Sequence, residues 1–368
     1  MGSAASAPRG RCRHRTPEGL CRGVTTVRNG VGVRTLGDLG AEAGIAVRAV
    51  GQSIQLVRWI HHEVVDRPIA KEDGSPVTIA DFAVQAVVAS HLTRHFAADA
   101  LVAEEDVTLL RSAAGGTLLP RVADCVRHIE RDVRVQQVLD WIDRGGGTCG
   151  KRFWALDPID GTKGLLRGGQ YAVALALIAD GQVQLGVLGC PQLSLAGLAE
   201  PNASANHSGP GGIAVAVRGC GAWWLSAGSE DLTRLSVSDM TDPTHARVLR
   251  SFEAQHGDVA RFERVLRALH AGVPPVLMDS QAKHALLAAG GADLLLRVPV
   301  STDSHDHIWD QAAGSLLVEE AGGKVSDLGG RPLDFTAGRR LIHNEGLVAS
   351  NDRLHEAALE AVQVTTRA

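Results

Sequence analysis

The chain has 368 residues, which is too long for one small core and suits two packed subdomains. Hydrophobic residues make up 45% and charged residues 21%, the balance of an ordinary globular enzyme. A formal net charge of −4 gives no electrostatic reason to expect nucleic acid or an anionic membrane as a partner, and no stretch approaches the roughly 18 consecutive apolar residues of a membrane span.

The first 36 residues differ from the rest of the chain. They contain seven arginines, no lysine and a single acid, Glu18, and they show no apolar face. This composition resembles an organelle transit peptide, although a disordered tail or a misplaced start codon would explain it equally well. We therefore expect residues 1–36 to lie outside the fold. The compartment is expected to be the cytoplasm, or a plastid or mitochondrion if the leader is a transit peptide.

The next part of the chain, residues 37–240, is expected to form an N-terminal α+β subdomain. Apolar residues recur at steps of three and four from about Gly37, and a Gly- and Pro-containing turn separates this helix from a second one. Two apolar strands are joined by Asp180-Gly181, a hairpin signal, and a polar loop follows at 197–212. The predicted helices are 39–60, 80–96 and 118–142, and the predicted strands are 100–103, 152–156, 171–179 and 182–189.

From about Thr241 strands and helices alternate, which predicts an α/β subdomain over residues 241–368. The predicted strands are 246–252, 275–279, 293–298, 323–327 and 346–350, and the predicted helices are 258–271, 280–290, 309–321 and 351–363.

Acidic residues stand at the ends of predicted strands or at a helix start. Taken singly, each has an ordinary structural explanation, because Asp81 and Asp310 could cap helices and Glu104-Glu105 could be a solvated turn. The run Asp157-Pro158-Ile159-Asp160-Gly161-Thr162 is more specific. Pro158 keeps Asp157 out of helical geometry, so two carboxylates converge just after an apolar strand. Like charges so close need a cation between them, and oxygen ligands without His or Cys favour Mg²⁺.

Five segments, in this order, resemble the lithium-sensitive, Mg²⁺-dependent phosphatases of the inositol monophosphatase-like superfamily. The segment at 154–168, through its run Lys163, Gly164, Leu166, Arg167 and Gly168, resembles the 3′(2′),5′-bisphosphate nucleotidase branch. The segments are KEDGSPVTIAD (71–81), VAEED (102–106), WALDPIDGTKGLLRG (154–168), DSQAKHALLAAGGADLLLRVP (279–299) and IWDQAAGSLLVEEAGG (308–323).

This resemblance implies a fold, a cofactor and a site. The fold would be α/β (α+β), with two subdomains in layered αβαβα order. Two to three Mg²⁺ ions would lie between the subdomains, and a water oriented and deprotonated by Asp81 and Thr162 would attack phosphorus in line. The implied metal ligands are Glu104, Asp157, the carbonyl of Ile159, Asp160 and Asp310. The implied substrate-binding residues are Thr162, His256, Ser280, Lys283, Arg297 and Asp310.

The implied activity is hydrolysis of the 3′-phosphate of adenosine 3′,5′-bisphosphate, and of 3′-phosphoadenylyl sulfate as well. The partner would thus be a small nucleotide, and we expect the enzyme to be a monomer. Lys163 and Arg167 beside the metal loop, with Lys283 and Arg297 in the second subdomain, would give the cleft positive charge for a second phosphate. An inositol polyphosphate 1-phosphatase or inositol monophosphatase activity, and a catalytically weak nucleotide-binding regulator, are the alternatives.

The chain departs from the family pattern close to its last acidic motif. Ser304-His305-Asp306-His307 stands where relatives usually carry Tyr-x-Glu-Lys, Gln311 replaces a usual His, and Leu165 replaces a usual Phe. These changes leave the implied metal ligands intact, so they concern substrate fit.

Overall fold

The computed structural model describes residues 35–64, 68–70, 76–112, 115–195, 209–253, 257–301 and 303–366. The predicted leader, except for its last two residues, and most of the predicted 197–212 loop lie outside them. The helices are α1 (Ala41–Glu63), α2 (Ile79–His95), α3 (Thr108–Arg111), α4 (Gly115–Arg127), α5 (Val135–Asp143), α6 (Thr162–Leu166), α7 (Val259–Ala268), α8 (Ala282–Ala288), α9 (Ala312–Glu320) and α10 (His355–Thr366), with 3₁₀ turns η1 (Leu36–Leu39), η2 (Pro243–His245) and η4 (Ile308–Asp310).

The strands form a seven-stranded sheet in the order β3-β4-β5-β6-β7-β8-β9, a five-stranded sheet in the order β11-β10-β12-β14-β13, and the short pair β1-β2. Their bounds are β1 (Ile69–Ala70), β2 (Pro76–Val77), β3 (Ala100–Ala103), β4 (Arg152–Asp160), β5 (Ala172–Ala179), β6 (Gln182–Cys190), β7 (Gly212–Val217), β8 (Gly221–Ser226), β9 (Leu232–Arg234), β10 (Val248–Arg250), β11 (Val276–Leu277), β12 (Leu294–Arg297), β13 (Lys324–Ser326) and β14 (Leu347–Ser350).

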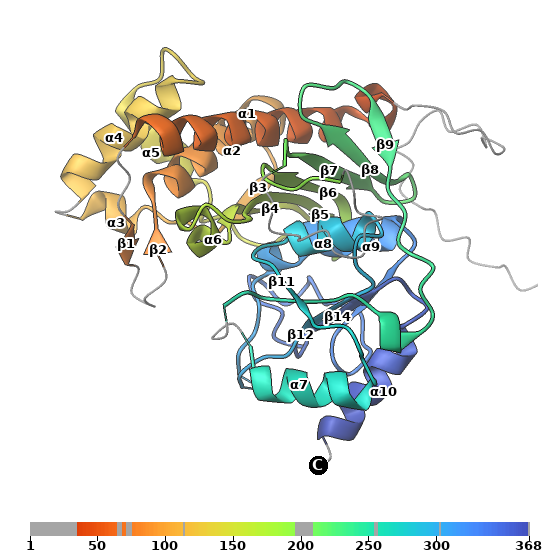
Figure 1. Ribbon diagram of the computed structural model, residues 1–368. Coiled ribbons are helices and arrows are strands. Elements are labelled where there is room, and N and C mark those ends of the chain that lie inside the picture. The colour runs from red at the N-terminus through yellow and green to blue at the C-terminus, as the bar shows by residue number, and fades with distance from the viewer. Residues whose placement is uncertain are drawn as a thin grey trace, which may run out of the picture.

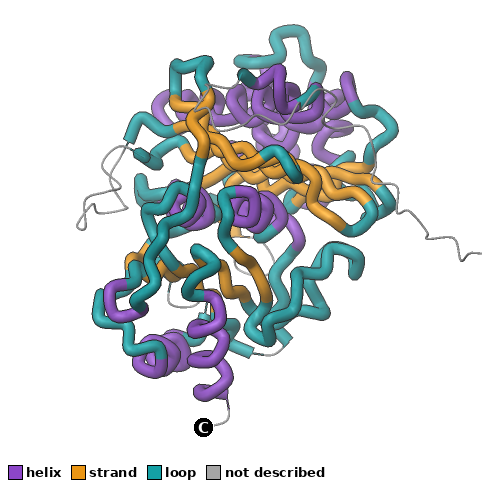
Figure 2. Tube along the Cα trace, turned by 90° about the vertical axis from the view of Figure 1, so that its right-hand side faces the viewer, coloured by secondary structure: helices purple, strands orange, loops and turns teal. Residues whose placement is uncertain are grey.

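Helices and sheets alternate in five layers, which confirms the predicted αβαβα fold (Figure 1). Helices α1 and α2 cover one face of the large sheet, whereas α8 and α9 lie between its other face and the small sheet. Helices α7 and α10 cover the far face of the small sheet, and Figure 2 shows the same stack from the side. Three hydrophobic cores fill the spaces between the layers. The middle strands are therefore buried on both faces, which explains their unbroken apolar sequence.

The predicted 180–181 hairpin is confirmed. Asp180 has φ 49° and Gly181 has φ 73°, and two successive left-handed residues are what a two-residue hairpin turn requires. The turn fixes the register of β5 against β6, where Val183 pairs with Ile178.

One prediction in the first subdomain was wrong, and three strands were missed. The 118–142 stretch is two helices, α4 and α5, because the chain turns between them, where Arg127 donates to the carbonyl of Val133 and Glu130 accepts from Arg94. The strands β7, β8 and β9 were not predicted, although the β-branched residues of β7 and the two tryptophans of β8 favour strands. The subdomain boundary at 240/241 stays a prediction, and it falls between β9 and η2.

The middle layer depends on a close approach of α9 to β6. A Cβ added at Gly186 would lie 2.6 Å from the carbonyl oxygen of Ala313. Gly186→Ala should therefore lower the free energy of unfolding by about 1–3 kcal/mol, because backbone would have to move. In the matched control Gly44→Ala the new Cβ meets nothing within 4 Å inside α1, so it should be neutral or stabilise by up to about 1 kcal/mol. Denaturant titration of both variants tests this, and equal effects would contradict it.

His355 is fully buried at the start of α10, where its ring nitrogens meet the hydroxyls of Ser326 and Ser350, each at 2.9 Å. Burial lowers the pKa of His355 to about 4. In the unfolded chain its pKa is about 6.5, so the unfolded state takes up the proton first as the pH falls. Stability should thus be complete above about pH 7 and decline by up to about 3 kcal/mol between pH 6.5 and 4.

Unfolding free energies measured from pH 4 to 8 check this expectation. His355→Leu should flatten the profile in that range even if its absolute stability is lower, whereas the exposed His61→Gln should keep the slope of the parent. An unchanged slope in His355→Leu would assign the acid sensitivity to other groups.

Candidate active site

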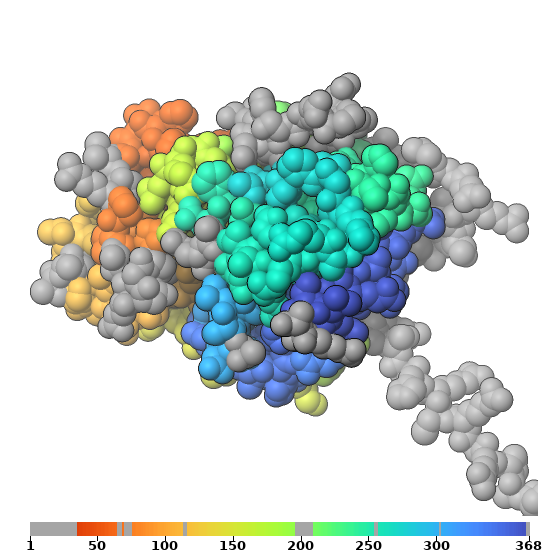
Figure 3. All heavy atoms as spheres, turned by 60° about the horizontal axis from the view of Figure 1, so that its bottom comes forward, coloured from red at the N-terminus to blue at the C-terminus, as the bar shows by residue number. Residues whose placement is uncertain are grey.

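A cavity of about 290 Å³ lies where the edges of the two sheets meet. Its lining comes from the end of β4 and the residues that follow it, and from the ends of β10, β11 and β12, together with η4. Figure 3 shows the yellow-green surface of the chain after β4 beside the green-cyan surface of the second half. The two halves of the chain thus build one site.

Parallel pairing places the acidic residues of the first half together. Strands β3 and β4 are parallel, with Ala103 opposite Leu156, and the amide of Glu104 donates to the carbonyl of Leu156 at 3.1 Å. Glu104, which directly follows β3, and Asp157, near the end of β4, consequently lie at the same end of the sheet. The register of β4 against β5 shifts between Asp157 and Asp160, and this irregularity carries Asp160 toward the second half of the chain.

The second half contributes through the carboxyl ends of three parallel strands. Strand β10 pairs in parallel with both β11 and β12. Arg250 ends β10, Ser280 follows β11 and Arg297 ends β12, and all three line the cavity. Ligands of open α/β sheets commonly bind outside such strand ends.

Gly161 and Ser280 face each other where the halves meet. Gly161 has φ 86° and Ser280 has φ 64°, both in the left-handed region. A Cβ on Gly161 would lie 3.1 Å from the Cβ of Ser280, so this approach needs glycine. A serine in the left-handed conformation is unusual and costs energy. Strained backbone of this kind is often found at functional sites.

The acidic end of the cavity is crowded and dry. Asp157 is only 3% exposed, and its buried Oδ1 has no hydrogen-bond partner among the described residues. Burial, and then the charges of Glu104, Asp160 and Asp310, raise the pKa of Asp157 well above its usual range. Burial raises the pKa of Asp160 to about 6, against the attraction of Lys283, and burial also raises the pKa of Asp310. These shifts mark an arrangement in which negative charge lacks compensation.

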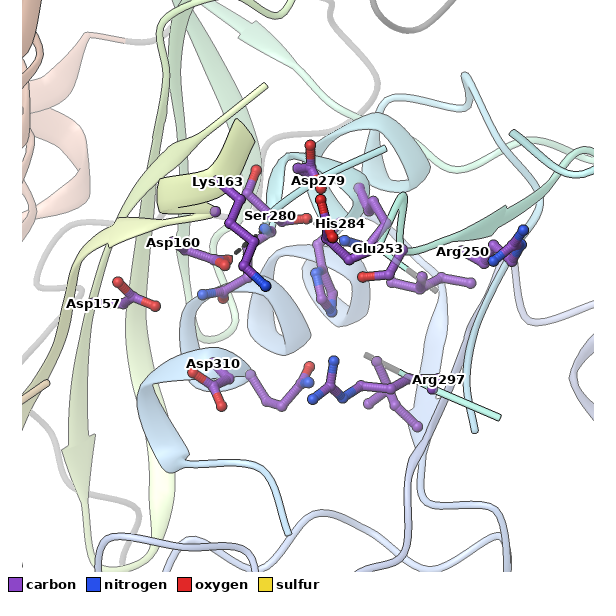
Figure 4. A pocket seen from close by; sticks show the side chains of 18 of the residues that line it. Asp157, Asp160, Lys163, Arg250, Glu253, Asp279, Ser280, His284, Arg297 and Asp310 are labelled. Carbon is purple, nitrogen blue, oxygen red and sulfur yellow. Dashed lines mark hydrogen bonds between the residues drawn. The ribbon is translucent and has the colours of Figure 1, made fainter. Parts of the chain in front are cut away.

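The atoms that could bind a metal ion here are all carboxylate or carbonyl oxygens, the ligands that Mg²⁺ prefers. Figure 4 shows Asp157, Asp160 and Asp310 at one end of the cavity, and Ile159, whose carbonyl is a candidate ligand, lies between Asp157 and Asp160 in β4. No three His, Cys, Asp or Glu side chains in the described segments stand close enough to form a metal site unaided. Two carboxylates are also held by the protein, because Asp160 accepts from the amide of Gln281 at 2.6 Å and Asp310 from that of His307 at 2.8 Å. The site thus fits a cation by its negative charge and its oxygen ligands, whereas the carboxylates lie too far apart to bind one ion together without moving.

Asp81 and Thr162 are brought together from different elements. Asp81 is buried in the first turn of α2, where one carboxylate oxygen accepts from the amide and hydroxyl of Thr78 at 2.8 and 2.7 Å. Its other oxygen lies 3.5 Å from the hydroxyl of Thr162, which also donates to the carbonyl of Ile159 at 3.1 Å. A fixed carboxylate beside a hydroxyl can accept a proton through it.

The residues expected to bind substrate are partly engaged with the protein. Lys283 is close to Asp160 and donates to the carbonyls of Met278 and Ser280 at 3.2 and 2.7 Å. Burial lowers the pKa of Lys283 to about 8, against the attraction of Asp160. Arg297 forms an ion pair with Asp306 at 2.6 Å. His256 lies outside the described residues.

Arg167 does not give the cleft the free positive charge that the sequence predicted. It forms ion pairs with Glu253 and with Asp279, the latter at 2.6 Å, and it lies over the ring of Phe252. Its charge is therefore used to join the two halves of the chain.

Arg250 and His284 line the cavity but were not predicted as site residues from the sequence. Both ring nitrogens of His284 are buried without a hydrogen-bond partner in the described chain, and burial lowers its pKa to about 3, so the ring is neutral. Neither residue belongs to a polar motif: Arg250 ends a short apolar strand and His284 lies in an alanine- and leucine-rich helix. Only the tertiary arrangement shows that both face the cavity.

None of the helices within the described segments has the length and apolar character needed to cross a membrane.

Comparison with known proteins is consistent with this fold and site. The sequence model of the inositol monophosphatase family matches residues 41–366. The 3′(2′),5′-bisphosphate nucleotidase of Schizosaccharomyces pombe is 38% identical over 345 residues, which make up 89% of this chain and 96% of that relative. The enzyme of the same name from Emericella nidulans is 36% identical over 349 residues, 88% of this chain and 97% of the relative. The solved structure of the Thermotoga maritima IMPase has a TM-score of 0.60 at 20% identity, covers 89% of this chain and 98% of its own, and supports the fold alone.

Proposed function

The chain belongs to the inositol monophosphatase family, and we propose that it is a 3′(2′),5′-bisphosphate nucleotidase that converts adenosine 3′,5′-bisphosphate to AMP and phosphate. The observation that carries the proposal is one cavity with carboxylates at one end, whose lining also includes the basic side chains of Lys283 and Arg297. A substrate with one phosphate to cut and another to hold matches this division of charge.

In the proposed reaction, water attacks the phosphorus of the 3′-phosphate and the bond from phosphorus to the 3′-oxygen breaks. The hydroxyl of Thr162 would donate to Asp81 in place of the carbonyl of Ile159, and its oxygen would accept a hydrogen bond from the attacking water and orient it. Thr78 holds Asp81 in place through two hydrogen bonds. The proton lost by water ends on the leaving 3′-oxygen once phosphate departs.

We propose that two to three Mg²⁺ ions are the cofactor. Bound there, Mg²⁺ would lower the pKa of water and offset the charge of the transferring phosphoryl group. Asp157 would be the central ligand, since its buried oxygen has no partner among the described residues. The full proposed ligand set is Glu104, Asp157, the carbonyl of Ile159, Asp160 and Asp310.

The 5′-phosphate is assigned to Ser280, Lys283 and Arg297, and the base to His256. Ser280 and Lys283 come from the segment after β11 and the start of α8, Arg297 comes from the end of β12, and all three line the cavity. Arg297 would exchange part of its pairing with Asp306 for the phosphate, which a planar guanidinium can grip with two hydrogen bonds. The same site would admit 3′-phosphoadenylyl sulfate, whose 5′-phosphate carries a sulfate.

We expect activity to require Mg²⁺ and to depend on Asp157. Asp157→Asn should lower kcat more than about 100-fold, because an amide supplies neither charge nor a good Mg²⁺ ligand. In EDTA the variant should melt at the parent temperature or higher, since one crowded buried charge is gone. Added Mg²⁺ should raise the melting temperature of the parent but not of the variant.

The matched control is Asp239→Asn, which removes an exposed carboxylate. It should respond to Mg²⁺ like the parent. Activity of Asp157→Asn within about 10-fold of the parent, or full parent activity in EDTA, would contradict the metal assignment.

We also expect the 5′-phosphate to be bound but not cut. Removing it, by using 3′-AMP, should lower kcat/KM by about 10- to 1000-fold, the range of charge-assisted hydrogen bonds. Lys283→Ala should lose a similar factor on the bisphosphate and change little on 3′-AMP, which makes a double-mutant cycle of one side chain and one phosphate. Lys324→Ala, an exposed lysine on β13, is the control.

Phosphate release from each substrate measures these constants. If the parent cleaves 3′-AMP or inositol 1-phosphate as efficiently as the bisphosphate, the nucleotidase assignment fails and the inositol phosphatase alternative replaces it. If the protein binds nucleotides and releases no phosphate from any substrate, the regulator alternative is correct.

A further inference from the structure

Arg250 occupies the end of the cavity farthest from the carboxylates. It is the last residue of β10, and Figure 4 shows its guanidinium opposite Asp157. The guanidinium lies over the ring of Phe262 with its carbon 5.6 Å from the ring centre. Its Nε is buried and has no hydrogen-bond partner in the described chain.

The other basic side chains of the cavity are occupied or lie elsewhere. Lys283 donates to two backbone carbonyls and Arg297 is paired with Asp306. Among the described lysines and arginines that line the cavity, Lys163 and Arg250 have side chains without a hydrogen bond or ion pair to another described residue, and Lys163 lies at the carboxylate end. Arg250 is thus positive charge at the far end of the cavity that the described protein does not use.

Strand register places Arg250 on a different face of the small sheet from Arg297. Leu249 pairs with Leu295, and both side chains belong to the core beneath α8 and α9. Side chains alternate along a strand, so Arg250 points to the opposite face, toward α7 and Phe262. Arg297, two residues beyond Leu295, points to the α8 and α9 side. The two guanidinium groups therefore serve different parts of the cavity.

Glu253 and Asp258, which line the same cavity as Arg250, are already engaged. Glu253 is paired with Arg167, and Asp258 caps α7 by accepting from the amide of Arg261 at 2.8 Å. An anion bound at Arg250 would form charge-assisted hydrogen bonds with a guanidinium that has no side-chain partner among the described residues.

Resting on the proposed nucleotidase function, we infer that Arg250 binds the terminal sulfate of 3′-phosphoadenylyl sulfate and is a specificity-determining residue for that substrate. The reaction at the carboxylate end of the cavity is the same for this substrate. Water attacks the phosphorus of the 3′-phosphate, the bond to the 3′-oxygen breaks, and the phosphate–sulfate bond stays intact. The 5′-phosphate remains with Lys283 and Arg297, and the sulfate extends one group farther, to the guanidinium that has no described partner.

The test compares kcat/KM for 3′-AMP, adenosine 3′,5′-bisphosphate and 3′-phosphoadenylyl sulfate at fixed Mg²⁺. Arg250→Gln should lower the value for the sulfate-bearing substrate by about 10- to 100-fold and change the other two by less than about 3-fold. Arg250→Lys keeps the charge but not the planar fork, so it should fall between the parent and Arg250→Gln. Arg264→Gln, an exposed arginine on α7, is the matched control and should leave all three values unchanged.

Several outcomes would overturn the inference. Equal losses on the bisphosphate and the sulfate-bearing substrate would assign Arg250 to the 5′-phosphate, and equal losses on all three would reduce it to packing on Phe262. If Arg250→Gln does not fold, the same substrate ratios in Arg250→Lys decide the question.

Failure of the proposed function is visible in the parent protein alone. If the parent prefers an inositol phosphate or cleaves no nucleotide, both proposals fall. If the parent cleaves the bisphosphate but not the sulfate-bearing substrate, only the role of Arg250 is lost.

Discussion

The repulsion among buried carboxylates is the constraint on which the rest of this site depends. Asp157 is almost fully buried and faces the charges of Glu104, Asp160 and Asp310. In a low-dielectric setting such charges raise one another's pKa and destabilise the fold unless a cation lies among them. An arrangement this unfavourable is expected where a protein binds a metal ion and not where it only needs stability.

The fold places these charges through its layers. Parallel pairing of β3 with β4 brings Glu104 beside Asp157, and the shift of register after Asp157 turns Asp160 toward the small sheet. Asp310 arrives from the opposite subdomain on η4, which packs against β4 and β5. The ion pairs of Arg167 with Glu253 and Asp279 then join the halves at the edge of the cavity. A change in how the halves pack would therefore alter the acidic end directly.

The altered segment at 304–307 retains an acid that holds Arg297. Asp306 pairs with Arg297 through one carboxylate oxygen and accepts from the amide of Gln311 through the other, at 2.8 Å. His307 stacks on Trp309 and caps the turn that carries Asp310. The departures from the family pattern thus form a connected set of contacts around the proposed 5′-phosphate site, where they would adjust substrate fit, and through His307 they also contact Asp310.

The sequence alone determined what depends on neighbours along the chain. Asp157, Asp160, Gly161 and Thr162 lie within six residues, so their convergence after a strand could be predicted, and the Asp180-Gly181 turn follows from local conformation. Only the tertiary structure decided which charged side chains of the cavity form ion pairs and which do not. Arg167 and Arg297 are neutralised by acids 86 and 9 residues away, whereas Arg250 and His284 face the cavity without such partners among the described residues. The physical reason is that an ion pair depends on the distance between two side chains in space. Their separation along the sequence does not determine that distance once two sheets and five layers have packed.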